Sequence, residues 1–278
     1  MILMLLDIGP ATIVINGEKE GKPYIFDRKP LAEQVERILA EIRDYLPVLK
    51  QKAFRIRRSD SLPPVARSMV SAVKAVDEAS LTPMAAVAGA VAEQLKDAIS
   101  DKGLQFISVN NGGDIAIVNR RGRPAGIAIG DMEQGRTTPY VVKVSELIDF
   151  GVATSGFGGR SFTLGLADIV TVVASSAPLA DAAATFIGNS TNVEANTVER
   201  RRAAEIDPAT DIADEMVTVH VGNLTGEQVA DALGRGRAVA ERLKRQGTIS
   251  DAVIILKGQM VSTISGNGNI RLEVTHGN

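Results

Sequence analysis

The sequence contains no cysteine and no tryptophan, and it has only two histidines, His220 and His276. A chain without cysteine forms no disulfide, binds no metal through thiolates and has no cysteine nucleophile. Two histidines are too few for a histidine-rich metal site, and neither is placed for a serine-hydrolase triad. His220 lies in the alternating stretch "MVTVHVG", where a structural residue on a strand is expected, and His276 is next to the C-terminus.

The net charge is also small, and the sequence has few long apolar runs. The formal net charge is −2, so no global field attracts nucleic acid or an anionic membrane. The apolar start "MILMLL" lacks a basic n-region and is too short for a signal peptide or a membrane span, and we expect an irregular lead into the first strand. These features predict a cytoplasmic protein that binds neither nucleic acid nor membranes. The apolar strands suggest a homodimer.

The chain does contain enough aliphatic side chains to form a sizeable hydrophobic core. Hydrophobic residues make up 45% of the 278 residues, whereas aromatic residues make up only 4%. The core must therefore be built from Ala, Val, Ile and Leu, as in proteins that pack helices on a sheet. We expect a single domain over residues 1–278, in which the polar residues 189–215 form a surface excursion or a lid.

Strand and helix patterns mix along the chain without a strict repeat. The stretch "ATIVINGEKEGKPYIF" predicts a hairpin, and apolar residues from Leu31 to Leu46 recur at helical spacing until Pro47 closes the helix. Residues 131–140 predict a polar loop. Several adjacent strands are joined by short turns, which predicts an α+β fold with packed helices on a mostly antiparallel or mixed sheet. There is no GxGxxG before a helix and no GxxxxGK[ST], so Rossmann and P-loop sites are not expected.

The stretch "FISVNNGGDIAIV" interrupts an apolar strand with the residue types that weaken strands most. Glycines let a ligand approach backbone N–H groups, and the neighbouring amide and carboxylate groups supply donors and acceptors. The alternative is a β-bulge or a tight bend. The candidate binding residues here are Asn111, Gly112, Gly113 and Asp114.

The stretch "ATSGFGGR" is rich in turn residues. A turn of this kind presents N–H groups to anions, and the arginine that follows could neutralise a phosphate or a carboxylate. The alternative is an ordinary surface turn. The candidate binding residues are Thr154, Ser155, Gly156 and Arg160.

In the stretch "PLADAAAT", Asp181 and Thr185 are four residues apart on an expected helix and share one face. A carboxylate and a hydroxyl one turn apart can hold a hard cation such as Mg²⁺. Alternatively, Asp181 interacts with the helix dipole and Thr185 bonds back to the backbone. A carboxylate among alanines nevertheless needs a reason.

These stretches, in this order, resemble the ApbE family of FAD:protein FMN transferases, and resemble still more an uncharacterised ApbE-like family. The pieces are "MAAVAGAVAE", "NNGGDI", "GVATSG" and "LADAAAT", within residues 80–190. The resemblance implies an α+β, T-fold-like architecture, a Mg²⁺ site at Asp181 and Thr185, and FAD or FMN as ligand or substrate. It also implies that the first two candidate stretches line the flavin-nucleotide pocket.

Two departures from the ApbE pattern imply a changed active site on a retained scaffold. ApbE proteins have a lysine where this chain has Ala88, and they carry a "HIIDPRTG"-like segment that is missing here. Where that segment is lost, Asp168 is a further candidate catalytic carboxylate beside Asp181. Three hypotheses follow. The first is a Mg²⁺-dependent transferase- or hydrolase-like enzyme that acts on a flavin nucleotide or a similar phosphate-bearing anionic heterocycle. The second is an enzyme on the same scaffold with a non-flavin substrate, either a hydrolase or a step in a cofactor pathway, and the third is a ligand-binding protein without catalysis.

Overall fold

The computed structural model describes residues 2–100, 102–131, 136–159, 161–266 and 268–275. The chain forms two compact units. The first comprises Met1–Ala125, Val144–Ala153 and Val173–Ala182, and the second comprises Gly126–Lys143, Thr154–Val172 and Ala183–Asn278.

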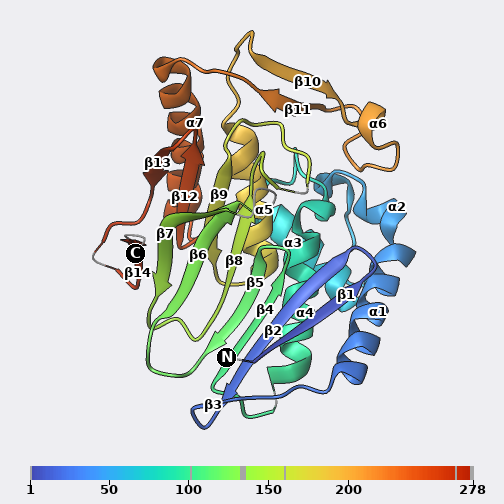
Figure 1. The fold of residues 1–278 in the computed structure, drawn as a ribbon. Helices are drawn as coiled ribbons and strands as arrows, with labels where there is room; N and C mark the ends of the chain where they lie inside the picture. Colours follow the sequence, from blue (N-terminus) through green and yellow to red (C-terminus); the bar gives the residue numbers. More distant parts are fainter. Residues whose placement is uncertain (1, 101, 132–135, 160, 267, 276–278) are drawn as a thin grey trace. The chain divides into compact units, whose positions relative to one another are not determined.

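The first unit is built on an antiparallel sheet. Its strands follow the order β1, β2, β4, β5, β8, and the short β3 pairs with β2 (Figure 1). The pairs β1–β2, β2–β3 and β4–β5 are hairpins with tight turns, whereas the helices lie between β3 and β4 along the chain. The bounds are β1 Leu3–Ile8, β2 Ala11–Lys19, β3 Lys22–Pro23, β4 Phe106–Asn111, β5 Asp114–Asn119 and β8 Asp149–Ser155.

Helices α1, α3 and α4 pack together beside this sheet, and α4 contacts both β4 and β5 (Figure 1). Helix α1 begins after Asp27, whose side chain accepts the N–H of Lys29, and it buries the stripe Leu31, Val35, Ile38 and Ile42. The bounds are α1 Arg28–Asp44, α2 Leu46–Leu49, η1 Ala53–Arg55, α3 Pro64–Asp77, η2 Pro83–Ala86 and α4 Val87–Ser100.

The strand register places two of the candidate polar residues on the buried face of the sheet. Leu6 pairs with Ile13, Ile13 with Asn111, and Asn111 with Asp114. Side chains in one such row point to the same face. Because Leu6 and Ile13 are fully buried, Asn111 and Asp114 also face the core rather than solvent.

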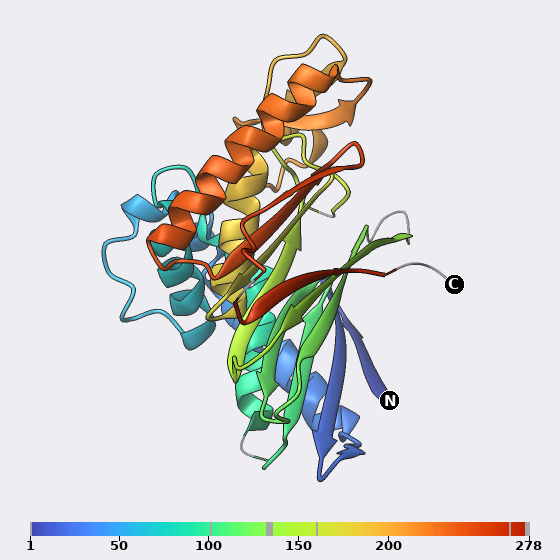
Figure 2. The same ribbon diagram turned by 90° about the vertical axis from the view of Figure 1, so that its left-hand side faces the viewer.

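In the second unit, β9, β12 and β13 are neighbours in the nine-stranded sheet, and two smaller sheets are formed by β10–β11 and by β6, β7 and β14. Helix α7 packs along the antiparallel pair β12–β13 (Figure 2), β10 pairs with β11, and β7 lies between β6 and β14. Helix α5 continues from the first unit into the second. The bounds are β6 Ala125–Asp131, β7 Arg136–Val144, β9 Ile169–Ala174, α5 Ala177–Ser190, β10 Val198–Arg202, α6 Ala203–Ile206, β11 Met216–Val221, α7 Gly226–Arg245, β12 Asp251–Leu256, β13 Gln259–Ser262 and β14 Ile270–Val274.

The predicted α+β class is confirmed, whereas several local predictions are wrong. The N-terminal "MILMLL" stretch is not irregular, because β1 pairs with β2 through a turn in which Gly9 has a positive φ of 55°. Pro47 does not end the first helix, which stops at Asp44; instead it lies in the first turn of α2. Proline is well tolerated there because the first-turn N–H groups have no intrahelical partner.

Two expected loops also contain regular structure. The loop expected at 131–140 is largely strand, because β7 begins at Arg136; residues 132–135 lie outside the described part. The excursion expected at 189–215 contains β10 and α6, since β10 finds its pairing partner in β11. Among the described helices, none is long and apolar enough to cross a membrane.

Candidate functional site

The interruption in "FISVNNGGDIAIV" is a two-residue hairpin turn. Gly112 and Gly113 have φ values of 68° and 113°, the positive values that tight hairpin turns require and that glycine adopts most easily. The β4–β5 pairing runs without a shift up to Asn111 and Asp114 on either side of the turn, so the tight-bend alternative is confirmed and the bulge is wrong. The Gly113 N–H donates to Asn110 Oδ1 at 2.8 Å, which leaves it engaged within the turn.

Asn111 ties this hairpin to the start of helix α4. Its side chain is only 4% exposed, and its Nδ2 donates to the carbonyl of Ala88 at 3.2 Å. The other amide atom, Oδ1, is buried and accepts no hydrogen bond within the described part of the chain. A buried acceptor without a donor is costly, so this oxygen is available to a ligand donor or a cation.

Asp181 reaches the same start of α4 from helix α5. Its Oδ2 accepts the N–H of Gly89 at 2.9 Å, and its carboxylate also accepts the N–H of Ala88. Burial raises the pKa of Asp181 to about 7, and the two backbone N–H groups offset part of this effect. The residue keeps some contact with solvent although its carboxylate is largely desolvated. It is therefore a carboxyl group that titrates near neutral pH.

The backbone of Ala88 and Gly89 brings three of the sequence motifs together. The Ala88 carbonyl accepts from Asn111, whereas the Ala88 and Gly89 N–H groups donate to Asp181. Ala88 is also the position at which ApbE proteins have a lysine. The small-residue helix, the glycine-rich hairpin and the Asp–Thr helix thus meet at one backbone segment.

A close backbone contact at this point explains two glycines that sequence reasoning did not single out. A Cβ on Gly89 would lie 2.4 Å from the Ala177 carbonyl oxygen, and a Cβ on Gly151 would lie 2.2 Å from the Ala177 nitrogen. Neither position has room for a side chain. The first residue of α5 is therefore held between α4 and β8, one turn before Asp181. The only sequence signal was the run of small residues around Gly89.

The candidates of the second motif lie in the second unit, where Thr154 and Ser155 end strand β8 rather than forming a turn. Gly156 follows with a φ of 138°, and a Cβ there would lie 2.5 Å from the Asp168 carbonyl oxygen. Asp168 Oδ2 accepts the N–H of Lys257, in the turn between β12 and β13, at 2.6 Å. This contact gives the Asp168 carboxylate a structural partner.

Thr154 Oγ1 lies 3.1 Å from Thr171 Oγ1 on β9.

Thr185 lies one turn after Asp181 on α5, as predicted. Arg160 lies outside the described residues. No group of three or more His, Asp or Glu side chains within the described ranges is arranged to hold a metal ion, so a cation at Asp181 would need hydroxyl, amide or ligand oxygens as well.

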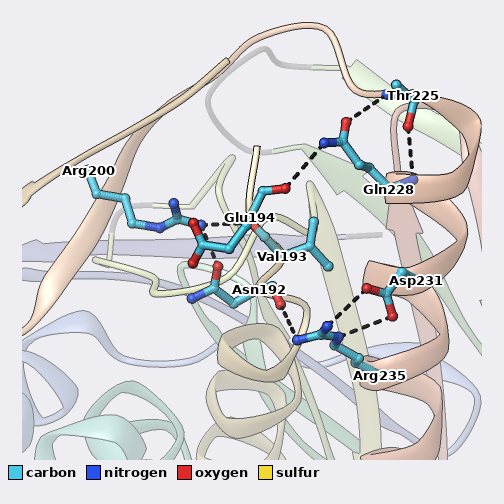
Figure 3. A network of polar contacts seen from close by, with 8 residues as sticks. All are labelled: Asn192, Val193, Glu194, Arg200, Thr225, Gln228, Asp231 and Arg235. Atoms are coloured by element: carbon cyan, nitrogen blue, oxygen red, sulfur yellow. Dashed lines mark hydrogen bonds and ion pairs between the residues drawn. The ribbon is translucent and has the colours of Figure 1, made fainter. Parts of the chain in front are cut away.

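A second polar cluster, in the second unit, borders a hollow of about 650 Å³ beside α7. Figure 3 shows that these residues are linked by hydrogen bonds, many of which join a side chain to a backbone group. Arg235 forms two bonds to Asp231 and a third to the Asn192 carbonyl, and Gln228 links the Thr225 cap to the Glu194 carbonyl. The cluster therefore fastens the segment after α5, the start of the expected excursion, to α7.

The family description "AbpE bacteria" matches residues 4–262. The chain belongs to this family. The ApbE-like relationship expected from the motifs is thus confirmed. A UPF0280 protein of Methanothermobacter thermautotrophicus is 40% identical over 120 residues, which is 43% of this chain and 46% of the relative. One from Methanosarcina barkeri is 36% identical over 141 residues, 50% of this chain and 54% of the relative. The chain thus spans about half the length of these curated relatives.

Solved structures with a similar arrangement include a flavin transferase ApbE from Vibrio cholerae. It has a TM-score of 0.48 and 16% identity, and the match covers 94% of this chain and 96% of that one. The apo form of the flavinyl transferase ApbE from Pseudomonas stutzeri has a TM-score of 0.47 and 14% identity, and the match covers 94% and 93% of the two chains.

Proposed function

We propose that this protein is a Mg²⁺-dependent enzyme that binds FAD, FMN or a similar phosphate-bearing anionic heterocycle. The observation that carries the proposal is the meeting of Asn111 and Asp181 at the start of α4. One residue has a buried acceptor without a donor, and the other is a desolvated carboxylate. The motif resemblance suggests the flavin-nucleotide class.

The chemistry of the donors fits a hard cation. Asp181 offers a carboxylate and Thr185 a hydroxyl, both oxygen ligands of the kind that Mg²⁺ prefers. Bound Mg²⁺ supplies a positive charge that polarises a phosphoryl oxygen. Burial disfavours the charged form of Asp181, so an adjacent cation would stabilise it. The proposed ligand-binding residues are Asn111, Gly112, Gly113, Asp114, Thr154, Ser155, Gly156 and Arg160.

Transfer of FMN to a protein is not part of the proposal, because the chain lacks the "HIIDPRTG"-like segment and has Ala88 in place of the lysine. The same scaffold acting on a non-flavin substrate is the alternative that these losses favour. A thermal-shift screen of metabolites, with and without Mg²⁺, separates the two. Stabilisation by FAD or FMN supports the proposal, whereas stabilisation only by other anionic metabolites supports the alternative.

Isothermal titration of the protein with FAD, FMN and ATP, each with and without Mg²⁺, tests the proposal directly. We expect Mg²⁺-dependent binding of at least one of the three that Asp181→Asn weakens by tenfold or more. Asp44→Asn, a matched change at an exposed carboxylate at the end of α1, is expected to have no effect. Absence of binding to all three would refute the flavin-nucleotide proposal.

A non-catalytic role is favoured by one specific observation, namely that Asp181 already binds the first N–H groups of α4. A carboxylate there stabilises a helix without any ligand. If Asp181→Asn left ligand binding unchanged and lowered only the stability, Asp181 would be a helix cap. The cytoplasmic location and the homodimer stay predictions.

A further inference from the structure

Helices α4 and α5 exchange hydrogen bonds through their N-terminal turns. Asp181 of α5 accepts the N–H of Gly89 at 2.9 Å, and Glu93 of α4 accepts the N–H of Ala177 at 3.1 Å. In both helices the accepting side chain lies four residues, about one turn, after the donating N–H. Each helix therefore caps the other, and the two contacts are linked through one turn of backbone.

Glu93 is held in place by a buried lysine. Its Oε1 accepts from Lys96 Nζ at 2.7 Å, which leaves Oε2 for Ala177. Lys96 is only 1% exposed, and it also donates to Asp149 at the start of β8 at 2.7 Å. Both carboxylate oxygens of Glu93 are thus engaged by buried or backbone donors. A carboxylate fixed in this way has little freedom to move.

The backbone around Ala177 gives the capping contact a defined position. The glycines at 89 and 151 let the backbone of α4 and β8 touch the first residue of α5. Glu93 binds the N–H of that same residue, and Asp181 follows one turn later. A shift of Ala177 therefore carries Asp181 with it, because helical backbone between them is continuous.

We infer that Glu93, fixed by Lys96, is the positioning residue that sets where the Asp181 carboxylate lies. Glu93 touches no proposed ligand; it acts through the first turn of α5. Supporting residues of this kind hold a site residue within a fraction of an ångström of its working position. The inference rests on the proposed function only in taking Asp181 as the residue that meets the ligand.

Amide hydrogen exchange tests the mechanical part without any ligand. In Glu93→Ala we expect exchange of the Ala177 amide to rise more than tenfold relative to core amides of β2, and exchange of the Gly89 amide to rise with it. Glu93→Gln keeps an acceptor for Ala177 and is expected to restore most of the protection at both sites. If Gly89 exchanged as in the unmodified protein while Ala177 lost protection, the positioning role would be refuted.

Titration with FAD, FMN or ATP in the presence of Mg²⁺ tests the functional part on the same variants. We expect Glu93→Ala to weaken binding tenfold or more, Glu93→Gln to recover most of the affinity, and Glu33→Ala on the exposed face of α1 to change nothing. Unchanged affinity in folded Glu93→Ala overturns the inference. If the unmodified protein binds none of the three, the proposed function fails and the exchange result alone decides the positioning role.

Discussion

Replacing Gly89 by alanine provides a sharp test of the close contact between α4 and α5. A methyl group there would lie 2.4 Å from the oxygen, 2.6 Å from the carbon and 2.9 Å from the next nitrogen of the Ala177–Pro178 backbone. These atoms are main chain and cannot rotate away as a side chain would. The start of α5 must then retreat, which also lengthens the hydrogen bond between Gly89 and Asp181.

The change in the free energy of unfolding caused by Gly89→Ala is the sum of a favourable helix-propensity contribution and two unfavourable packing and hydrogen-bond contributions. Alanine in a helix is favoured over glycine by up to about 1 kcal/mol. Overpacking against backbone costs about 1–3 kcal/mol, and a weakened bond to a buried carboxylate adds about 1–3 kcal/mol. We expect Gly89→Ala to lower the free energy of unfolding by about 3 kcal/mol, which corresponds to a melting temperature lower by several degrees.

Alanine substitutions at two glycines of α7, Gly234 and Gly236, provide matched comparisons for the effect of Gly89→Ala on stability. A Cβ on Gly234 would meet nothing within 4 Å, so Gly234→Ala is expected to raise stability by about 0.5–1 kcal/mol. A Cβ on Gly236 would meet the Thr191 methyl at 2.7 Å and Ile254 Cδ1 at 3.1 Å. These are side-chain atoms, so Gly236→Ala should fall between the other two. Chemical and thermal unfolding measure all three, and a Gly89→Ala variant as stable as Gly234→Ala would refute the packing argument.

Three other predictions concern Asp181, Gly112 and Thr225. The pKa of Asp181 is raised to about 7, so the folded state holds a proton that the unfolded state releases near pH 4. Stability should therefore fall as pH rises from about 4 to 7, by up to about 4 kcal/mol, and Asp181→Asn should flatten that part of the unfolding profile; an unchanged slope would contradict the shift. Gly112→Ala, at a φ of 68°, should cost about 1–2 kcal/mol in urea unfolding, and a stabilising effect would contradict the hairpin turn. Thr225→Ala removes the capping box of α7 and should cost about 1 kcal/mol, whereas an unchanged melting temperature would show that the cap contributes little.

Much of the local structure was predictable because it depends on neighbouring residues. Period-two alternation correctly predicted β11, and helical spacing from Leu31 correctly predicted α1. The errors occurred where pairing decided the outcome. The "MILMLL" stretch has no alternation of its own and becomes β1 because β2 offers it a partner. The glycines of "NNGGD" resembled a bulge because glycine suits both a bulge and a hairpin turn.

In the candidate site, too, the residues could be predicted from the sequence, but the long-range contacts that bring them together could not. Sequence order alone marked Asn111 and Asp181 as candidates, but their meeting point depends on contacts that span 23 and 92 residues. No local pattern encodes such contacts. Glu93 went unnoticed because a glutamate on a helix is ordinarily a solvated residue, and only its bond to Ala177 and the buried Lys96 distinguish it. A charged side chain beside a run of small helical residues is therefore a signal worth testing, since small residues allow close helix contact and the charge can then reach a neighbouring helix end.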